Sequence, residues 1–264
     1  MNRHRRGAFA CVVLLFTAAV GRVHGQQRGV FLPPTLLDVL PSSLAPHAEA
    51  LGDRVLKPGK EKTTIISEIV TDRGERRQLR VILQLPALVR IDELKGNRAS
   101  AFDGTASAGV TSGTEEQLLE IFSSDTAEAL MASSRDGGAF QLLGRFVKSV
   151  PEGKSPLYDI YEWSGPIRSL PLAPDRLKRY AFDSETGLLA YTEYSDDSFS
   201  PPLGVRIQFS DWKKFDGSSY PGRIDRFENG LLTFSWTALE TASSRRQDTK
   251  LFSELNGMGK EQGK

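Results

Sequence analysis

Residues 203–239 read LGVRIQFSDWKKFDGSSYPGRIDRFENGLLTFSWTAL and carry the strongest structural signal in the chain. In this stretch Val205, Ile207 and Phe209 alternate with polar residues, as in a strand with one buried face. An Asn-Gly pair at 229–230 separates two such runs and predicts a two-residue hairpin, because both residues tolerate a positive φ. The stretch therefore predicts antiparallel strands joined by short turns.

The same pattern extends outward along the chain. Residues 63–70 are rich in β-branched side chains, residues 79–85 alternate, and residues 88–91 are apolar, so we expect three more strands there. Consecutive hairpins favour an antiparallel meander, curled or barrel-like, with helices covering one side. The strands expected in the C-terminal half are 158–163, 177–182, 188–194, 205–212, 220–227 and 231–239.

Two helical stretches interrupt the strands. Apolar residues recur at helical spacing over residues 44–56. Residues 114–117 (TEEQ) have the form of a capping box before a second apolar stretch that continues to residue 131. Between strands and helix, residues 102–114 are small and polar, which predicts a surface loop rather than a gate. Residues 139–150 are typical of either a helix or a strand.

The first 25 residues have the pattern of a secretory leader. Arg3, Arg5 and Arg6 precede an apolar run over residues 8–20, and small or aliphatic residues then precede Gln26. The run is shorter than the roughly 20 apolar residues that span a membrane. We therefore expect cleavage before Gln26, an exported protein, and no transmembrane span in residues 26–264.

Composition excludes several classes of function. The chain has 264 residues, 34 Lys+Arg, 33 Asp+Glu and one Cys. Removal of the arginine-rich leader leaves more acids than bases, so nucleic acid is not an expected partner. Without the leader the chain has no cysteine, and its single histidine is His47. This excludes His-rich zinc sites and thiol chemistry. We expect His47 on the surface near a helix start rather than in a catalytic triad.

Length favours one domain. A chain of this size buries a large hydrophobic core without disulfides. We expect residues 26–242 to form that domain and the polar residues 243–264 to form a flexible C-terminal tail.

Two motifs in the C-terminal strands resemble those of a known superfamily. Residues 180–188 (YAFDSETGL) resemble the fD-x-x-TG-L hairpin of the LolA/LolB-like superfamily of periplasmic lipoprotein carriers. Residues 209–221 (FSDWKKFDGSSYP) look like the f-x-d-y-x-x-v-dG-x-x-yP segment of the same group. The order of leader, helix, strand pair, central helices and terminal meander is also similar.

This resemblance implies a mainly β fold with some α, an incomplete, half-open antiparallel β-barrel wrapped around a few helices, with an apolar cavity for lipid acyl chains. Each buried CH₂ contributes about 0.8 kcal/mol, so an acyl chain is held without covalent chemistry. The resemblance also implies a periplasmic location. We expect a monomeric carrier or chaperone for lipid or lipoprotein acyl chains that is not an enzyme and uses no cofactor or metal. The candidate cavity-lining residues are Leu79, Val81, Leu83, Phe182, Val205, Ile207, Phe209, Leu232, Phe234 and Trp236.

Other interpretations remain open. Such apolar stripes are more often packed core than cavity wall, and sequence does not separate a filled interior from a hollow one. With a filled interior, the chain is instead an envelope interaction or sensing module whose partner is another envelope protein. Trp212, Tyr220 and Phe227 are its natural anchors if they are exposed together. A carboxylate-dependent hydrolase is the least favoured, because the sequence brings no two acids together.

Overall fold

The fold is known from a computed structural model. It describes residues 42–56, 61–84, 88–96, 98–104, 107–109, 113–134, 139–147, 156–164, 177–245 and 250–253. These residues belong to one compact unit, Pro34–Lys264. The expected leader at residues 1–25 lies outside them.

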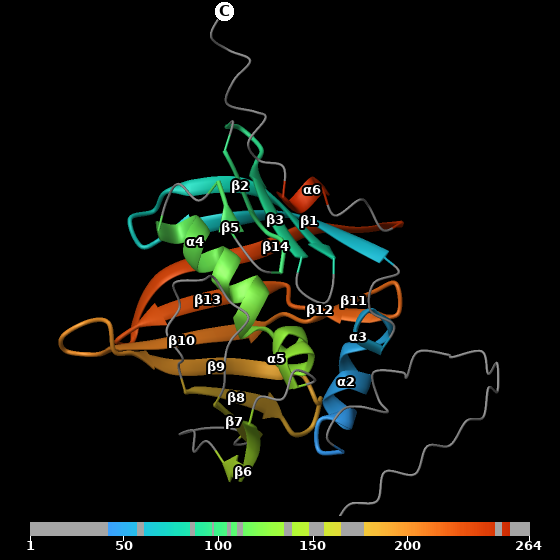
Figure 1. The fold of residues 1–264 in the computed structure, drawn as a ribbon, viewed down its shortest axis with the longest axis vertical. Coiled ribbons are helices and arrows are strands. Elements are labelled where there is room, and N and C mark those ends of the chain that lie inside the picture. Colours follow the sequence, from blue (N-terminus) through green and yellow to red (C-terminus); the bar gives the residue numbers. More distant parts are fainter. Residues whose placement is uncertain are drawn as a thin grey trace, which may run out of the picture. The chain divides into compact units, whose positions relative to one another are not determined.

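Most of the described chain is β-strand, and twelve of the described strands form one antiparallel sheet (Figure 1). Its N-terminal strands are β1 (Glu61–Thr71), β2 (Arg76–Gln84), β3 (Leu88–Glu93), β4 (Ala99–Phe102) and β5 (Ser107–Ala108). The others are β6 (Ala139–Val147), β7 (Leu157–Ser164), β8 (Lys178–Asp183), β9 (Leu189–Asp196), β10 (Leu203–Ser210), β13 (Arg223–Glu228) and β14 (Leu231–Arg245).

The order across the sheet is β5-β4-β3-β2-β1-β14-β13-β10-β9-β8-β7-β6. Two meanders are joined where the first strand pairs with the last, β1 with β14. The sheet remains open, because β5 and β6 lie at opposite edges. A separate hairpin of β11 (Lys213–Phe215) and β12 (Ser218–Tyr220) leaves the sheet between β10 and β13. The expected antiparallel meander is confirmed, and residues 139–147 are a strand.

Bulges curve this sheet. One lies in β1–β14 pairing between Ile66 and Ser67, another in β13–β14 pairing between Arg226 and Phe227. An extra residue in one strand bends it and increases the local twist. The open sheet therefore has an inner face that wraps around helices.

Both sequence motifs and the Asn-Gly pair form turns. In the second motif, Asp216 and Gly217 have φ of 48° and 71° at the turn between β11 and β12. Asp183 Oδ1 accepts hydrogen bonds from the backbone amides of Glu185 (3.0 Å) and Thr186 (2.8 Å), and Gly187 has φ of 72°. These contacts close the β8–β9 hairpin and explain the D-x-x-TG spacing. Asn229 and Gly230 have φ of 49° and 82°, which confirms the predicted two-residue turn between β13 and β14.

A bent helical segment crosses the inner face of the sheet (Figure 1). It consists of α4 (Gly113–Glu120), a π-helical turn η1 (Ile121–Asp125) and α5 (Ala127–Ser134). Thr126 interrupts it with an extended backbone, φ −80° and ψ 161°. The loop expected at 102–114 is shorter, since β5 and the start of α4 fall inside it.

The expected N-terminal helix forms as two pieces, α2 (Ala45–Leu51) and α3 (Asp53–Leu56). Gly52 separates them with φ of 84° and pairs with Ser218 of β12. A Cβ on Gly52 would lie 2.2 Å from the carbonyl oxygen of Gly217, so this close approach requires glycine.

The C-terminal segment departs from the expected tail. β14 continues to Arg245, three residues past the expected domain end, and α6 (Lys250–Ser253) follows. Phe252 of α6 is buried, and Arg90 Nη1 donates to the carbonyl oxygen of Leu251 at 2.8 Å. Residues 250–253 therefore pack on the domain instead of extending from it.

Candidate ligand-binding site

Nine of the ten predicted cavity-lining residues lie in the buried core under the helical segment. They occupy alternate positions of β2, β8, β10 and β14, as the period of a strand requires. The nine buried residues are Leu79, Val81, Leu83, Phe182, Val205, Ile207, Phe209, Phe234 and Trp236.

Leu232 is the exception, and the prediction for it is wrong. Its side chain is 42% exposed. In the β13–β14 pairing, Phe234 lies opposite Arg226 and Leu232 opposite Phe227, so Thr233 is an extra residue. This bulge takes Leu232 off the inner face, which strict alternation from Phe234 does not anticipate.

Polar contacts fasten the first part of the helical segment to the sheet. Arg77 of β2 forms an ion pair with Glu115 of α4, 2.8 Å from Nη1 to Oε1. Gln117 Nε2 donates to Glu228 Oε1 of β13 at 3.0 Å. Both contacts lie at α4, and they hold it from two different strands.

A buried ion pair fastens the π-helical turn η1. Lys178 Nζ of β8 contacts Asp125 Oδ1, and both side chains are almost completely buried. Lys178 Nζ also donates to Ser124 Oγ at 3.1 Å. Tyr180 Oη donates to the carbonyl oxygen of Ser124 at 2.9 Å, and Thr192 Oγ1 donates to that of Asp125 at 2.8 Å. The carbonyl groups that a π-helix end leaves free are therefore satisfied by the sheet.

Two tyrosines of this buried cluster stay protonated. Burial raises the pKa of Tyr180 well above its ordinary value, and the nearby Asp125 carboxylate raises it further. Burial likewise raises the pKa of Tyr194, whose ring lies 4.8 Å from Lys178 Nζ. Each phenol therefore remains a hydrogen-bond donor over the physiological pH range.

The described part of α5 rests mainly on apolar surface. Ala127, Leu130 and Met131 are buried against the core. At its N-terminus lies a small apolar cavity of about 20 Å³ between helix and sheet. Ligand pockets measure about 300–1,000 Å³, so the interior is closed around its own side chains in this conformation. The cavity is lined by Ile65, Leu83, Leu88, Val89, Phe122, Thr126, Ala127, Glu128, Leu189, Phe209, Trp212, Tyr220 and Pro221.

His47 is buried, contrary to the expectation of a surface position. Its ring stacks on Phe182 with centroids 4.1 Å apart. Nδ1 lies 2.9 Å from the carbonyl oxygen of Gly187, and Nε2 lies 3.0 Å from Tyr161 Oη. Burial lowers the pKa of His47, although the Gly187 carbonyl opposes this shift. This histidine attaches α2 to the β8–β9 hairpin.

The three aromatic anchors of the interaction module do not form one exposed patch. Tyr220 is buried, and its hydroxyl lies 2.9 Å from Thr63 Oγ1. Trp212 and Phe227 are half-buried. Within the described ranges, no cluster of three His, Cys, Asp or Glu residues is placed to hold a metal ion. No helix among those ranges is long and apolar enough to cross a membrane.

An open antiparallel sheet curved around a helical segment is also the fold of a solved protein domain. A domain from Vibrio parahaemolyticus described as an outer membrane lipoprotein-sorting protein superposes with a TM-score of 0.51 at 11% identity, covering 80% of this chain and 94% of that one. A LolA superfamily protein from Nitrosomonas europaea gives 0.48 at 13% identity, covering 80% and 96%. The sequence itself matches no protein-family model and no curated protein.

The buried polar cluster around Lys178 and Asp125 is not among the features predicted from the sequence. One feature of the sequence does indicate it: Lys178 alternates with Tyr180 and Phe182 along β8, so its side chain is expected on the same inner face of the sheet. A lysine at an inner position needs a buried partner. The sequence does not show which acid supplies it, because Asp125 lies 53 residues away along the chain.

Proposed function

We propose that this protein is an exported carrier that binds lipid or lipoprotein acyl chains between the inner face of its sheet and helix α5, without catalysing a reaction. In this proposal residues 1–25 are removed before Gln26, and the periplasmic protein acts as a monomeric single domain. The LolA-like fold supports the carrier class.

The distribution of polar contacts carries the proposal. Polar contacts join the helical segment to the sheet at Glu115, Gln117, Ser124 and Asp125, all of which precede Thr126. Thr126 then breaks the helix, and the described buried residues of α5 are the apolar Ala127, Ala129, Leu130 and Met131 and one acid, Glu128. Apolar contacts are non-directional, so α5 can leave the sheet and let a ligand chain take its place. We infer that Thr126 is the hinge of this movement.

The free-energy cost of displacing α5 is offset by binding of an acyl chain in its place. Displacing α5 exposes the apolar side chains of Ala127, Leu130 and Met131 together with the sheet surface below them. An acyl chain covers that surface again and adds about 0.8 kcal/mol for each of its CH₂ groups. A chain of ordinary membrane-lipid length therefore offsets the cost of opening, while an empty protein returns to the closed form.

Native mass spectrometry of protein purified without delipidation tests this binding. We expect adducts of lipid mass, or their appearance after incubation with vesicles of phosphatidylethanolamine and phosphatidylglycerol. Ala127→Leu adds volume to the cavity wall at the base of α5, so this variant should carry less lipid. Ala108→Leu on the edge strand β5 is the matched control and should carry as much lipid as the unaltered protein.

A clean protein mass after incubation with vesicles would contradict the proposal, as would equal lipid loss in the two variants. That outcome would favour the envelope interaction module instead. The far-ultraviolet circular dichroism of both variants, compared with that of the unaltered protein, separates lost binding from lost folding.

A further inference from the structure

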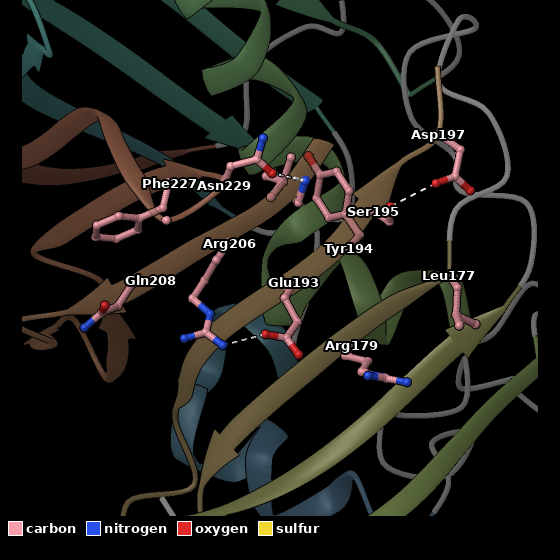
Figure 2. Close-up of a pocket in the computed structure, with 13 residues that line it drawn as sticks. Leu177, Arg179, Glu193, Tyr194, Ser195, Asp197, Arg206, Gln208, Phe227 and Asn229 are labelled. Atoms are coloured by element: carbon pink, nitrogen blue, oxygen red, sulfur yellow. Dashed lines mark hydrogen bonds and ion pairs between the residues drawn. The ribbon is translucent and has the colours of Figure 1, made fainter. Parts of the chain in front are cut away.

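The face of the sheet turned away from the helices carries a groove of about 850 Å³ (Figure 2). This volume falls in the range of ligand pockets. Its floor consists of side chains that alternate with the buried ones: Arg179 on β8, Glu193 on β9, and Arg206 and Gln208 on β10. Phe227 of β13 supplies an apolar wall. The lipid-binding proposal uses none of these five residues.

Charged side chains cross this face in a row, with alternating sign. Glu162, Arg179, Glu193 and Arg206 lie opposite one another on the four successive strands β7 to β10. Arg179 Nε is 3.1 Å from Glu162 Oε2, and Arg206 Nη2 is 2.7 Å from Glu193 Oε2. The guanidinium of Arg206 also lies over the ring of Tyr191, 4.7 Å from its centroid.

These contacts hold the row in place before any ligand arrives. Both arginine side chains remain about half exposed, 48% for Arg179 and 47% for Arg206. Each therefore presents N–H groups to the groove while one edge is fixed by a carboxylate. Side chains ordered in advance lose little conformational entropy when they bind a ligand.

A second depression of about 260 Å³ continues the groove, because it shares Arg206 and Gln208 with the first. Tyr158 and Tyr191 line it, with their rings in edge contact at a centroid distance of 5.4 Å. The combined surface thus pairs aromatic rings with fixed hydrogen-bonding groups.

We propose that this groove binds a neutral oligosaccharide. Among the described lining residues, Arg179 and Arg206 are balanced by Glu193 and Asp197, so the groove does not select for an anion. A hydroxyl group both donates and accepts, so vicinal hydroxyls match a row in which carboxylate and guanidinium alternate. The backbone groups of these strands are already paired within the sheet, so an extended peptide cannot add as a further strand on this face.

Calorimetric titration of the full protein with maltotetraose, cellotetraose and chitotetraose tests the inference. We expect saturable binding of at least one of the three. Arg206→Gln removes the guanidinium group that contacts Glu193 and Tyr191, and should weaken this binding at least tenfold. Arg76→Gln is the matched control, because Arg76 forms a similar exposed cross-strand pair with Glu68, 3.2 Å apart, outside the groove.

Three results would overturn the inference: no saturable binding of any of these oligosaccharides, equal weakening by both substitutions, or tighter binding of a sulfated than of a neutral tetrasaccharide. Because Arg206 does not line the α5 cavity, and the 850 Å³ groove shares no lining residue with that cavity, lipid adducts in Arg206→Gln should equal those of the unaltered protein. Failure here therefore leaves the carrier proposal unaffected.

Discussion

At the scale of single residues, His47 gives the protein a dependence on pH. Burial keeps the folded-state pKa of His47 below the ordinary value of 6.5, so the unfolded chain takes up its proton first as the solution is acidified. The contribution of the neutral imidazole to stability is complete above pH 6.5 and is lost as the pH falls below that value. Asp159, whose carboxylate favours the protonated imidazole, reduces this loss but does not reverse it.

We predict that urea unfolding between pH 7.5 and 5.5 shows falling stability for the unaltered protein and a nearly flat profile for His47→Gln. The variant should also lose about 1–3 kcal/mol at pH 7.5, because buried hydrogen-bond partners at Gly187 and Tyr161 are left poorly satisfied. A slope shared by both proteins would mean that another group is responsible.

The buried pair of Lys178 and Asp125 makes a second prediction at this scale. Asp125 Oδ2 has no hydrogen-bond partner among the described residues, and Lys178 is almost completely buried. Lys178→Met leaves a buried carboxylate without its cation and should cost about 3–5 kcal/mol in the free energy of unfolding. Lys178→Met combined with Asp125→Leu should recover most of that loss. A double variant as unstable as the sum of the single variants would contradict this account of the pair.

At the scale of elements, α4 and η1 should be more stable locally than α5. The first two are fastened by ion pairs and hydrogen bonds, whereas α5 follows the break at Thr126. Amide hydrogen exchange measured by mass spectrometry should therefore show faster exchange in Ala127–Ser134 than in Ile121–Asp125. Uniform protection across both elements would argue against a hinge at Thr126.

Among the described contacts of the C-terminal helix α6 are the Arg90 hydrogen bond to the Leu251 carbonyl and the buried side chain of Phe252. Arg90→Ala removes the hydrogen bond to the Leu251 carbonyl, so α6 should detach from the domain more often and expose Phe252. We predict faster tryptic cleavage after Lys250. Because Arg90→Ala also leaves Asp92 without its partner at 2.7 Å, urea unfolding of the variant is measured alongside, and cleavage after Lys250 should increase more than global unfolding accounts for. Arg80→Ala on the neighbouring strand β2 is the control. Equal cleavage in both variants would show that Arg90 does not retain α6.

The elements also show how far the sequence determines the fold. The alternation in β10 and the Asn229–Gly230 turn are local patterns, and both were predicted correctly. The pairing of β1 with β14, the extra residue at Thr233 and the burial of His47 depend on contacts between distant segments. Periodicity identifies the buried faces, but it does not show that the interior closes to about 20 Å³.

At the scale of the whole molecule, the exported form should begin at Gln26. Expression in a bacterial host and intact mass measurement of the periplasmic fraction should give the mass of residues 26–264. A protein that retains residues 1–25 and sediments with membranes would show that the apolar run acts as an anchor.

Quenching of tryptophan fluorescence by phospholipid with brominated acyl chains tests the central claim most directly, because bromine quenches only at contact distance. Trp212 lines the cavity at the base of α5, so it reports an acyl chain that enters there. The account predicts stronger quenching by brominated than by ordinary vesicles, and a clear loss of that quenching in Trp212→Phe. Equal emission with both kinds of vesicle would contradict an acyl-chain site beneath α5.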